Sequence, residues 1–254
     1  MSKLPDPDYA AIKLRHELSI DDSAAVDFGL VLPTLNIRIC EESLKEGTLG
    51  ACKVEGLWRL IIISTAITYE AQKRFTIAHE TGHILLHHGT CYCTKDDLFG
   101  YQTIKGREND ANQFASAFLL PQTVVSQALK YKDISFDMAE KLTEQYGISL
   151  TATLIRLVKS SSDNVCLFVH SGGKIEYAIP SPGCSFRPKS GLIDECSLAN
   201  RLTSGKTNIN GDTNSSFWFE DNRFLEDSTC IEESRLFKNL QKTITIVNIN
   251  SDDM

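Results

Sequence analysis

The sequence lacks features that would each assign the chain to a particular class of protein. No stretch approaches about 18 consecutive apolar residues, the length that a membrane-spanning helix needs, and the first residues lack the apolar core of a secretory signal. Acidic residues (33) outnumber basic residues (26), and the formal net charge is -7. This balance gives no electrostatic reason to expect strong non-specific nucleic-acid binding, although a local basic face is compatible with it. Because the sequence has no membrane-spanning stretch and no secretory signal, we expect no membrane association.

The chain also lacks the dense cysteine spacing of a disulfide scaffold. Its eight cysteines are spread over 254 residues, of which 42% are hydrophobic, so a core of ordinary size is available. We interpret these cysteines as reduced thiols and predict a cytoplasmic protein. The sequence contains no internal repeat and no low-complexity tract, and its length suits two domains, or one domain with appendages.

Hydrophobic periodicity and turn residues predict an α+β fold. We expect helices at 9–18, 73–88 and 108–120, strands at 36–40 and 57–65, an irregular segment at 90–106, a hairpin at 165–180, a helix near 191–202 and a last strand at 243–249. Gly89 is placed to end the second of these helices. The predicted organisation is a first domain at 1–123, a helical segment at 124–160 and a C-terminal α+β domain at 161–254.

The segment RFTIAHETGHILLHH, from Arg74 to His88, contains two histidines four residues apart. Residues i and i+4 share one face of a helix, so His79 and His83 can direct two imidazole nitrogens at one metal ion. Glu80 can reach a metal-bound water without binding the metal, and for this reason His-Glu-x-x-His is typical of metal-dependent hydrolases. The alternative is a polar edge on an ordinary amphipathic helix. Both histidines flank an apolar stripe, however, and this half-buried position favours metal binding.

A catalytic zinc ion needs a third protein ligand and an open position for water. The metzincin pattern HExxHxxGxxH is excluded because Leu86 and Gly89 stand at its last two defined positions. In the segment ENDANQFASAFLL, Glu108 lies nearer the centre of the apolar stripe than Asp110 does, and a carboxylate there is costly unless a metal ion pairs with it. Asn112, one turn further on, is suited to a hydrogen bond that orients a ligand. The alternative for Glu108 is an ordinary first-turn acid favoured by the helix dipole.

These two segments together carry a family resemblance. RFTIAHETGHILLH followed by E-x-x-A-N-x-F-A-x-x-x-L-L-P resembles the ImmA/IrrE family of zinc metallopeptidases, over roughly residues 9–160. The resemblance implies a zincin-like metallopeptidase domain that binds one Zn²⁺ per chain. It assigns His79, His83 and Glu108 as metal ligands, Glu80 as the general base and Asn112 as the residue that supports a ligand. The family commonly has Glu where this chain has Asp110, and Leu-Met-Pro where it has Leu-Leu-Pro; neither change touches an expected ligand.

The resemblance implies hydrolysis of peptide bonds. Zinc would lower the pKa of its bound water to about 7, and Glu80 would remove the proton and pass it on. We expect the strand at 57–65 to be an edge strand that aligns an extended peptide by backbone pairing. Beyond zinc, the residue that stabilises the oxyanion is open, with four candidates that are more typical of structural or exposed positions: Tyr92, Tyr101, His87 and His88.

The run HHGTCYC, just after the metal-binding helix, concentrates soft metal ligands. Cys91 and Cys93 could hold a second metal ion, or supply a thiolate that closes the open zinc position. The alternative, that these cysteines have no role, is the more common situation for free thiols in irregular segments.

The segment FDMAEKLTEQYGISLTATLIRLV resembles a helix-turn-helix, with Gly147 in the turn and Ser149 opening the second helix. Residues 130–160 hold five basic and four acidic residues, and a net charge of +1 makes a poor phosphate-binding face. We therefore favour packing or protein docking over direct DNA binding for this segment.

Members of the resembled family act on helix-turn-helix repressors, and some carry an added sensor-like domain. The resemblance therefore implies a zinc-dependent endopeptidase of narrow specificity whose partner is a protein substrate, a helix-turn-helix repressor. Residues 161–254 would then form a sensor or docking domain. The main alternative is a non-proteolytic antirepressor or DNA-binding regulator in which zinc is structural. A toxin–antitoxin or phage-associated component with the same chemistry is a third possibility.

Overall fold

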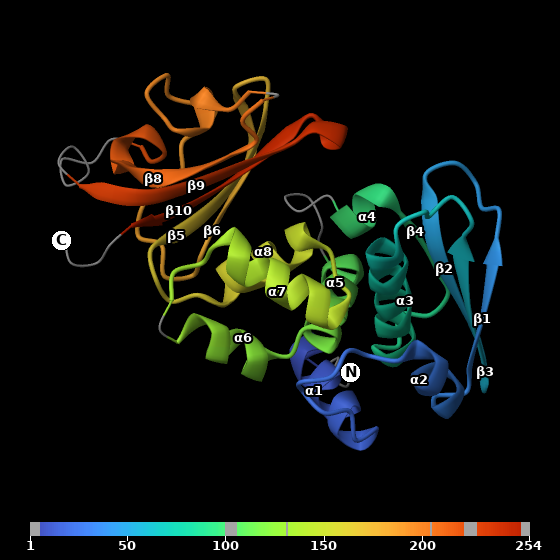
Figure 1. The fold of residues 1–254 in the computed structure, drawn as a ribbon. Coiled ribbons are helices and arrows are strands. Elements are labelled where there is room, and N and C mark those ends of the chain that lie inside the picture. The colour runs from blue at the N-terminus through green and yellow to red at the C-terminus, as the bar shows by residue number, and fades with distance from the viewer. Residues whose placement is uncertain (1–5, 100–105, 131, 204, 221–227, 250–254) are drawn as a thin grey trace. The chain divides into compact units, whose positions relative to one another are not determined.

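The computed structural model describes residues 6–99, 106–130, 132–203, 205–220 and 228–249, and its helices and strands confirm the α+β class (Figure 1). The chain forms two compact units, each with its own sheet. The first unit comprises Met1–Val124 and Lys141–Ala152, and the second comprises Val125–Glu140 and Thr153–Met254. The helices α6 (Gln122–Leu129), α7 (Phe136–Tyr146) and α8 (Leu150–Ser160) contribute residues to both units.

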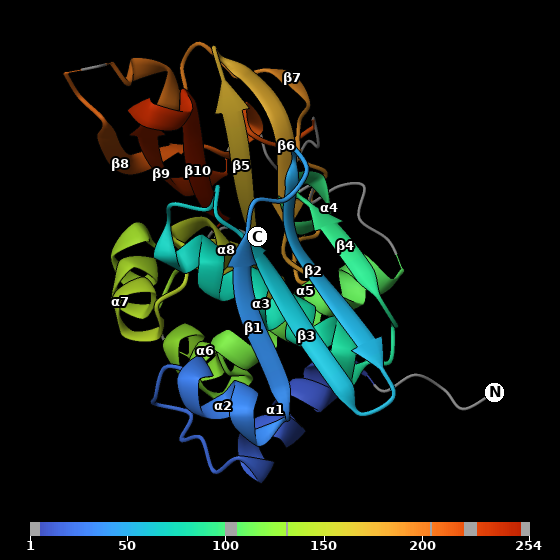
Figure 2. The ribbon, with the colours of Figure 1, turned by 90° about the vertical axis from the view of Figure 1, so that its right-hand side faces the viewer.

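The first unit combines helices with a four-stranded sheet. Its elements are α1 (Pro7–Glu17), α2 (Phe28–Thr34), β1 (Ile37–Glu42), β2 (Thr48–Glu55), β3 (Trp58–Ser64), α3 (Glu70–Leu85), β4 (Cys91–Thr94), α4 (Lys95–Phe99) and α5 (Arg107–Leu119). The strand order is β1-β3-β2-β4, with β1 parallel to β3 and the other pairs antiparallel (Figure 2).

The expectation that the strand at 57–65 lies at the sheet edge was wrong. β3 pairs with β1 on one side and with β2 on the other, so β1 and β4 are the edge strands. The long parallel register between β1 and β3 joins segments separated by β2, and no local pattern in the sequence reveals such a pairing. The segment at 90–106, expected to be irregular, contributes β4 and α4 to this unit.

Helix α3 is buried along its middle because it packs against β2 and β3 on one side and α5 on another. Every residue from Thr76 to Ile84 is buried. Gly82 permits the close contact with α5, since a Cβ atom at this position would lie 2.9 Å from Cδ1 of Phe114. A larger residue would therefore push the two helices apart.

The C-terminus of α3 differs from the prediction. The helix ends at Leu85, before Gly89, and His87 takes a left-handed conformation with φ 59°. The backbone N–H of His88 then donates to the carbonyl of His83 at 2.9 Å, as in a Schellman turn. This turn reverses the chain and brings His88 back against the last turn of the helix.

The second unit is built on a six-stranded antiparallel sheet. Its strands are β5 (Val165–Ser171), β6 (Lys174–Pro180), β7 (Gly191–Leu192), β8 (Asn208–Asn214), β9 (Thr229–Phe237) and β10 (Lys242–Ile249), in the order β7-β6-β5-β10-β9-β8. The structure confirms the β5–β6 hairpin and the last strand. The helix predicted near 191–202 was wrong, because this stretch holds β7 and the 3₁₀ turn η1 (Ala199–Arg201). Two further 3₁₀ turns are η2 (Ser215–Phe217) and η3 (Lys238–Leu240).

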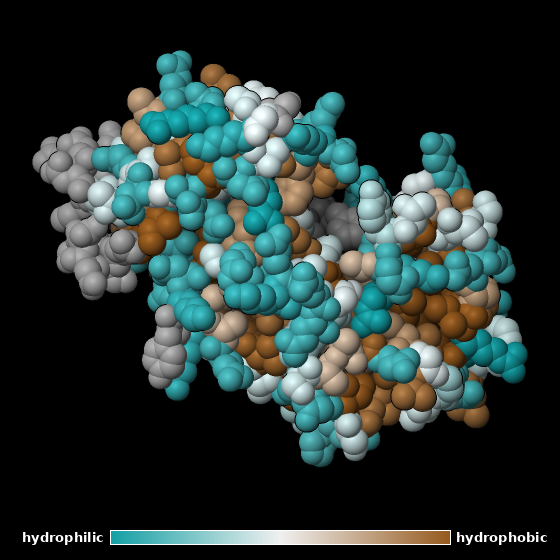
Figure 3. Space-filling model, viewed as in Figure 1, coloured by the Kyte–Doolittle hydropathy of each residue, from teal (hydrophilic) through white to brown (hydrophobic). Residues whose placement is uncertain are grey.

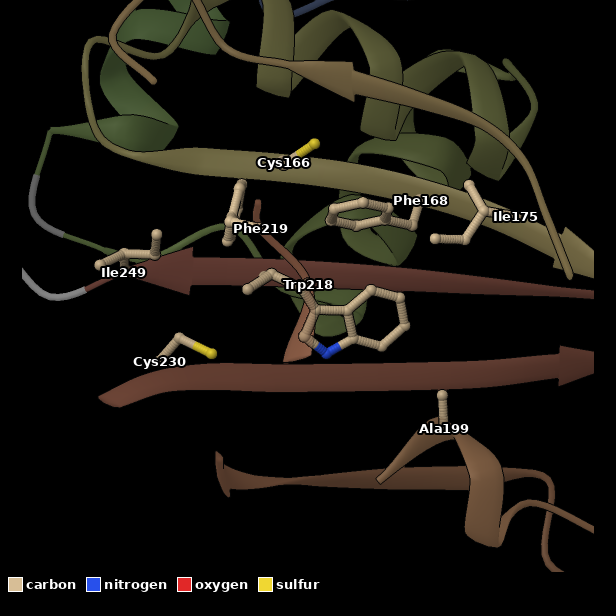
Figure 4. Packing of buried hydrophobic residues seen from close by; sticks show 9 residues of the cluster. Cys166, Phe168, Ile175, Ala199, Trp218, Phe219, Cys230 and Ile249 are labelled. Atoms are coloured by element: carbon tan, nitrogen blue, oxygen red, sulfur yellow. The ribbon is translucent and has the colours of Figure 1, made fainter. Parts of the chain in front are cut away.

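Aromatic side chains fill the core of the second unit. The rings of Trp218 and Phe168 lie against each other with centroids 4.7 Å apart, and Phe219 packs on Phe168 at 5.9 Å (Figure 4). All three side chains are fully buried. The cluster therefore fills this side of the sheet with protein atoms.

Glu232, on β9, is a buried carboxylate within this core. Its Oε2 accepts hydrogen bonds from the indole N–H of Trp218 at 2.9 Å and from the backbone N–H of Leu198 at 3.1 Å. Its Oε1 accepts from the backbone N–H of Ala199 at 2.6 Å and from the hydroxyl of Ser234 at 3.3 Å. Both oxygens are thus saturated by donors, which offsets the cost of burying the carboxylate.

Polar residues cover most of the face shown in Figure 3, and hydrophobic residues gather in places on the first unit. Leu30, Leu57 and Trp58 are among its exposed large hydrophobic residues. Among the described residues, no helix has the length and apolar character needed to cross a membrane.

Candidate metal centre

Four potential metal-binding side chains of the first unit meet at one point. The Nε2 atoms of His79 and His83 are 2.9 Å apart, and both face Oε2 of Glu108, at 3.2 and 3.1 Å respectively. Sγ of Cys93 lies 3.5 Å from Nε2 of His83. All four donor atoms lie within 4.8 Å of one another. The i, i+4 spacing on α3 supplies the two imidazoles, α5 supplies the carboxylate and the edge strand β4 supplies the thiol.

This donor set fits a divalent transition metal ion. Zinc binds imidazole nitrogen, carboxylate oxygen and thiolate sulfur at about 2.0–2.3 Å, and tetrahedral ligand atoms are then about 3.3–3.7 Å apart. The nitrogen, oxygen and sulfur atoms of this cluster converge on a similar scale. Without a metal ion, at least one imidazole nitrogen must carry a proton to separate the two nitrogens and the carboxylate oxygen. The cluster could therefore hold a metal ion.

His79 is held with Nε2 toward the cluster by Asn112. The side-chain amide of Asn112 donates to the backbone carbonyl of Asp97 at 2.8 Å, which directs its Oδ1 at Nδ1 of His79, also at 2.8 Å. Because Oδ1 accepts, Nδ1 of His79 carries a proton, and Nε2 is the nitrogen that faces the cluster. The structure thus brings Asn112 to the place that the sequence predicted, where it orients a potential ligand.

His83 is oriented by His88, which the turn after α3 returns to it. The two Nδ1 atoms are 2.9 Å apart, so Nε2 of His83 is free to face the cluster. Burial, with the neighbouring His83 and Arg107, lowers the pKa of His88 to about 4. His88 is therefore neutral near pH 7, and one of the two Nδ1 atoms donates to the other. His88 therefore orients the ring of His83 by contacting its Nδ1 atom, on the side away from the donor cluster.

Glu108 lies in the first turn of α5 with its side chain 27% exposed, and it is the most accessible of the four donors. Burial opposes its charge, but the contacts with His79 and His83 outweigh burial and hold the pKa of Glu108 well below its usual range. The carboxylate is therefore ionised and available as a ligand.

Glu80 is completely buried next to the donor cluster. Among the described residues, neither of its oxygens has a hydrogen-bond partner of ordinary geometry. Burial raises the pKa of Glu80 to about 7, while the nearby thiol of Cys93 and the imidazole of His83 act in the opposite direction. A buried carboxylate without a partner costs free energy, so its retention points to a functional role.

Gly50, on β2, makes room for Glu80. A Cβ atom at this position would lie 2.6 Å from Oε1 of Glu80 and 2.7 Å from Cγ2 of Thr76, distances that side chains do not adopt. In the β2–β4 register, Gly50 lies opposite Cys93. Nothing in the local sequence around Gly50 indicated this role, because it depends on the pairing of the strands and on their contact with α3.

A comparison with known families decides what kind of domain holds this cluster. Residues 34–158 match the family model of peptidase M78, described as the IrrE N-terminal-like domain. Over these residues the chain belongs to this family. The first unit therefore carries a metallopeptidase-type domain, in agreement with the resemblance found in the sequence.

Two individual proteins extend the comparison. The chain is 31% identical over 106 residues to uncharacterized immunity region protein 2 of Bacillus phage phi105, an alignment that covers 41% of this chain and 63% of the phage protein. It also resembles a solved Mycobacterium tuberculosis transcriptional regulator, with a TM-score of 0.59 and 13% identity over 96% of this chain and 76% of that chain. At this identity, the second likeness concerns the fold alone.

Within the IrrE N-terminal-like domain, the four oxyanion candidates have different surroundings. His87 and Tyr92 are exposed, Tyr92 by 73%. His88 contacts the far side of His83, as described above, and Tyr101 lies outside the described residues. Of the two cysteines in HHGTCYC, Cys93 enters the donor cluster and Cys91 does not.

Proposed function

We propose that the chain is a zinc-dependent endopeptidase of narrow specificity that cleaves a helix-turn-helix transcriptional repressor and thereby derepresses its genes. The observation that carries this proposal is Glu80, a fully buried carboxylate without a partner among the described residues, beside a convergent set of metal donors. A purely structural metal site has no need of such a carboxylate, whereas hydrolysis needs a base at this place.

In this proposal His79, His83 and Glu108 hold the zinc ion, and Asn112 and His88 fix the two imidazoles. Bound zinc supplies Lewis acidity, which polarises the scissile carbonyl and acidifies water. Glu80 takes the proton of the attacking water and delivers it to the leaving amine. Burial of Glu80 among α3 and β2 keeps bulk water from competing for that proton.

The names of the relatives support a role in regulation. One relative is an immunity region protein of a phage, and one structural neighbour is a transcriptional regulator. The proposed partner is accordingly a protein substrate, and the near-neutral helical segment argues against direct DNA binding by this chain. We propose that the protein acts in the cytoplasm, where repressors and reduced thiols are found.

The proposal is tested by incubating purified protein with helix-turn-helix repressors encoded near its gene and measuring products by intact-mass spectrometry. We expect about one zinc per chain and a single cleavage. Glu80→Gln should retain zinc but slow cleavage about 10²–10⁴-fold, the usual contribution of a general base. His83→Ala should lose both zinc and cleavage, whereas His16→Ala, which changes an exposed histidine on α1 outside the cluster, should keep both.

A second function is favoured by one observation, the presence of Cys93 as a fourth donor. Four protein ligands are typical of structural zinc sites, and the protein would then act as a non-proteolytic antirepressor. Gene expression separates the two functions. If Glu80→Gln derepresses target genes as well as wild type does, the activity is binding; if zinc-free protein still cleaves its partner, zinc hydrolysis is excluded.

A further inference from the structure

The donor cluster contains one ligand more than a hydrolytic zinc site uses. Catalytic zinc sites have three protein ligands and leave one position for water, whereas structural sites are closed by a fourth ligand. His79, His83 and Glu108 complete the first set, and Cys93 adds a thiol within the same group of atoms. The position of Cys93 therefore decides whether the site is open or closed.

We propose that the Cys93 thiolate is the fourth zinc ligand in the resting protein and that it keeps the peptidase latent until it is displaced. This inference rests on the proposed function and adds its regulation. Cys93 is completely buried, and Sγ lies 3.5 Å from Nε2 of His83. Thiolate is a preferred zinc ligand, so a thiol held at this distance from the other donors would bind the ion that they bind.

The unpartnered carboxylate of Glu80 is an independent indication that this place receives a ligand. Both oxygens of Glu80 are buried without an ordinary hydrogen-bond partner among the described residues, and the Cys93 thiol is close enough to interact with this carboxylate. The Cys93 thiol is thus close both to the base and to a donor nitrogen. A thiolate at this point occupies the space in which Glu80 would otherwise meet the attacking water.

The neighbouring cysteines show that this arrangement is specific to Cys93. Cys52, opposite Cys91 in the β2–β4 register, is equally buried, but its thiol lies 3.5 Å from the carbonyl of Gly89 and outside the cluster. Cys91 is half-buried on the same strand as Cys93 and also remains outside. Cys91 therefore provides a matched control for substitutions of Cys93.

The strand that carries Cys93 is suited to movement. β4 is short, lies at the sheet edge, and pairs within the described residues with β2 alone. A shift of this strand would withdraw Sγ, while the two histidines are carried by α3 and Glu108 by α5. Displacement leaves three protein ligands, and the departing thiolate takes up a proton to become a thiol.

The test combines zinc K-edge X-ray absorption with cleavage of the repressor substrate, using zinc-loaded wild type, Cys93→Ala and Cys91→Ala. Zinc–sulfur scattering lies at about 2.3 Å and is separable from nitrogen and oxygen at about 2.0–2.1 Å. We expect one sulfur in wild type and in Cys91→Ala, and none in Cys93→Ala. Cys93→Ala should bind zinc more weakly, because it lacks one ligand. It should also cleave at least about tenfold faster, because no molecules are held in the inactive state in which the Cys93 thiolate occupies the fourth zinc position. Cys91→Ala should cleave at the wild-type rate.

The outcomes separate this inference from the proposed function. Zinc without sulfur in wild type overturns the inference, and cleavage by the same sample would leave the proposed function intact. Sulfur in wild type with no cleavage by wild type or Cys93→Ala overturns the proposed function and the latency with it, because the site is then structural. If Cys93→Ala does not fold, the wild-type spectrum still shows whether sulfur binds the zinc ion. Cys93→Ser then replaces Cys93→Ala in the cleavage measurement. A cleavage rate of the Cys93 variant that equals the wild-type rate contradicts latency.

Discussion

Glu80 and Glu232 are both completely buried glutamates, one in each unit, and they differ in what surrounds them. Glu232 accepts hydrogen bonds at both oxygens from two backbone N–H groups, an indole and a hydroxyl. Glu80 has no partner of ordinary geometry among the described residues. Burial raises the pKa of both carboxyls. An indole, two backbone N–H groups and a hydroxyl oppose the shift for Glu232, whereas the nearby thiols of Cys93 and Cys52 and the imidazole of His83 oppose it for Glu80.

We infer from this difference that the Glu232 carboxylate stabilises the fold, whereas burial of the Glu80 carboxylate lowers the free energy of unfolding. Glu232 joins β9 to Trp218 and to the segment at Leu198, so its hydrogen bonds hold the second unit together. Glu80 has no such set of donors among the described residues, and it lies beside the metal-donor cluster. Buried groups left without partners are a property of active sites, where stability is given up for reactivity.

The largest effect on stability is expected from removing Glu232. In Glu232→Ala the indole of Trp218 and the two backbone N–H groups lose their acceptor, and each buried donor left without a partner costs about 1–3 kcal/mol. We expect a loss of at least about 3 kcal/mol, measured by urea unfolding. Glu176→Ala, which removes a half-exposed ion pair with Lys242 in the same sheet, should change stability by less than about 1 kcal/mol. Equal effects of the two variants would contradict a special role for Glu232.

A smaller effect is expected from Gly50→Ala in the first unit. The new methyl group would collide with Glu80 and Thr76, and overpacking of this kind typically costs about 1–3 kcal/mol. The measurement is the unfolding free energy, compared with the cost of the same change in a Thr76→Ser, Glu80→Ala background. That background removes both colliding atoms, so most of the cost should disappear. A cost that stays the same would show that some other contact requires glycine.

The smallest change, and one of opposite sign, is expected from Glu80→Gln. Removing the charge from a buried carboxylate without partners should raise the stability of the metal-free protein by about 1 kcal/mol, as is common when strained functional groups are replaced. Glu232→Gln should lower stability, because its new amide N–H₂ faces donors. Thermal unfolding in the presence of a chelator measures both variants. Shifts of the same sign would remove the distinction between the two glutamates.

The parts of the fold that the sequence predicted well are those specified locally. The periodicity of apolar residues located α3 and α5, and the turn residues around Gly172 located the β5–β6 hairpin. β8 was missed because its sequence, NINGDTN, has Ile209 as its only large apolar residue; it becomes a strand by pairing with β9 at the sheet edge. β4 was missed because it has only four residues and owes its structure to β2.

The candidate site also contains residues that local sequence patterns predicted and residues whose roles depend on strand pairing. Spacing along one helix was enough to pair His79 with His83, and the apolar stripe of the next helix singled out Glu108. The role of Gly50 depends on the β2–β4 register and on how that sheet contacts α3, so no pattern within β2 encodes it. The run HHGTCYC indicated a possible thiolate ligand, but it did not distinguish Cys93 from Cys91, since this depends on the same register. The contact of His88 with His83 follows from the backbone reversal at His87, which is set by helix termination and has no signature in the spacing of the histidines.

The donor atoms of the metal centre all come from residues 79–108. In the second unit, by contrast, the first strand of the sheet pairs with the last, β5 with β10. During synthesis the chain emerges from its N-terminus, so the whole donor set leaves the ribosome while the last strand of the second sheet is still untranslated. Short loops between ligands also close quickly. The donor set can therefore come together before the second sheet has its last strand, so a metal ion that binds it could do so while the chain is still on the ribosome.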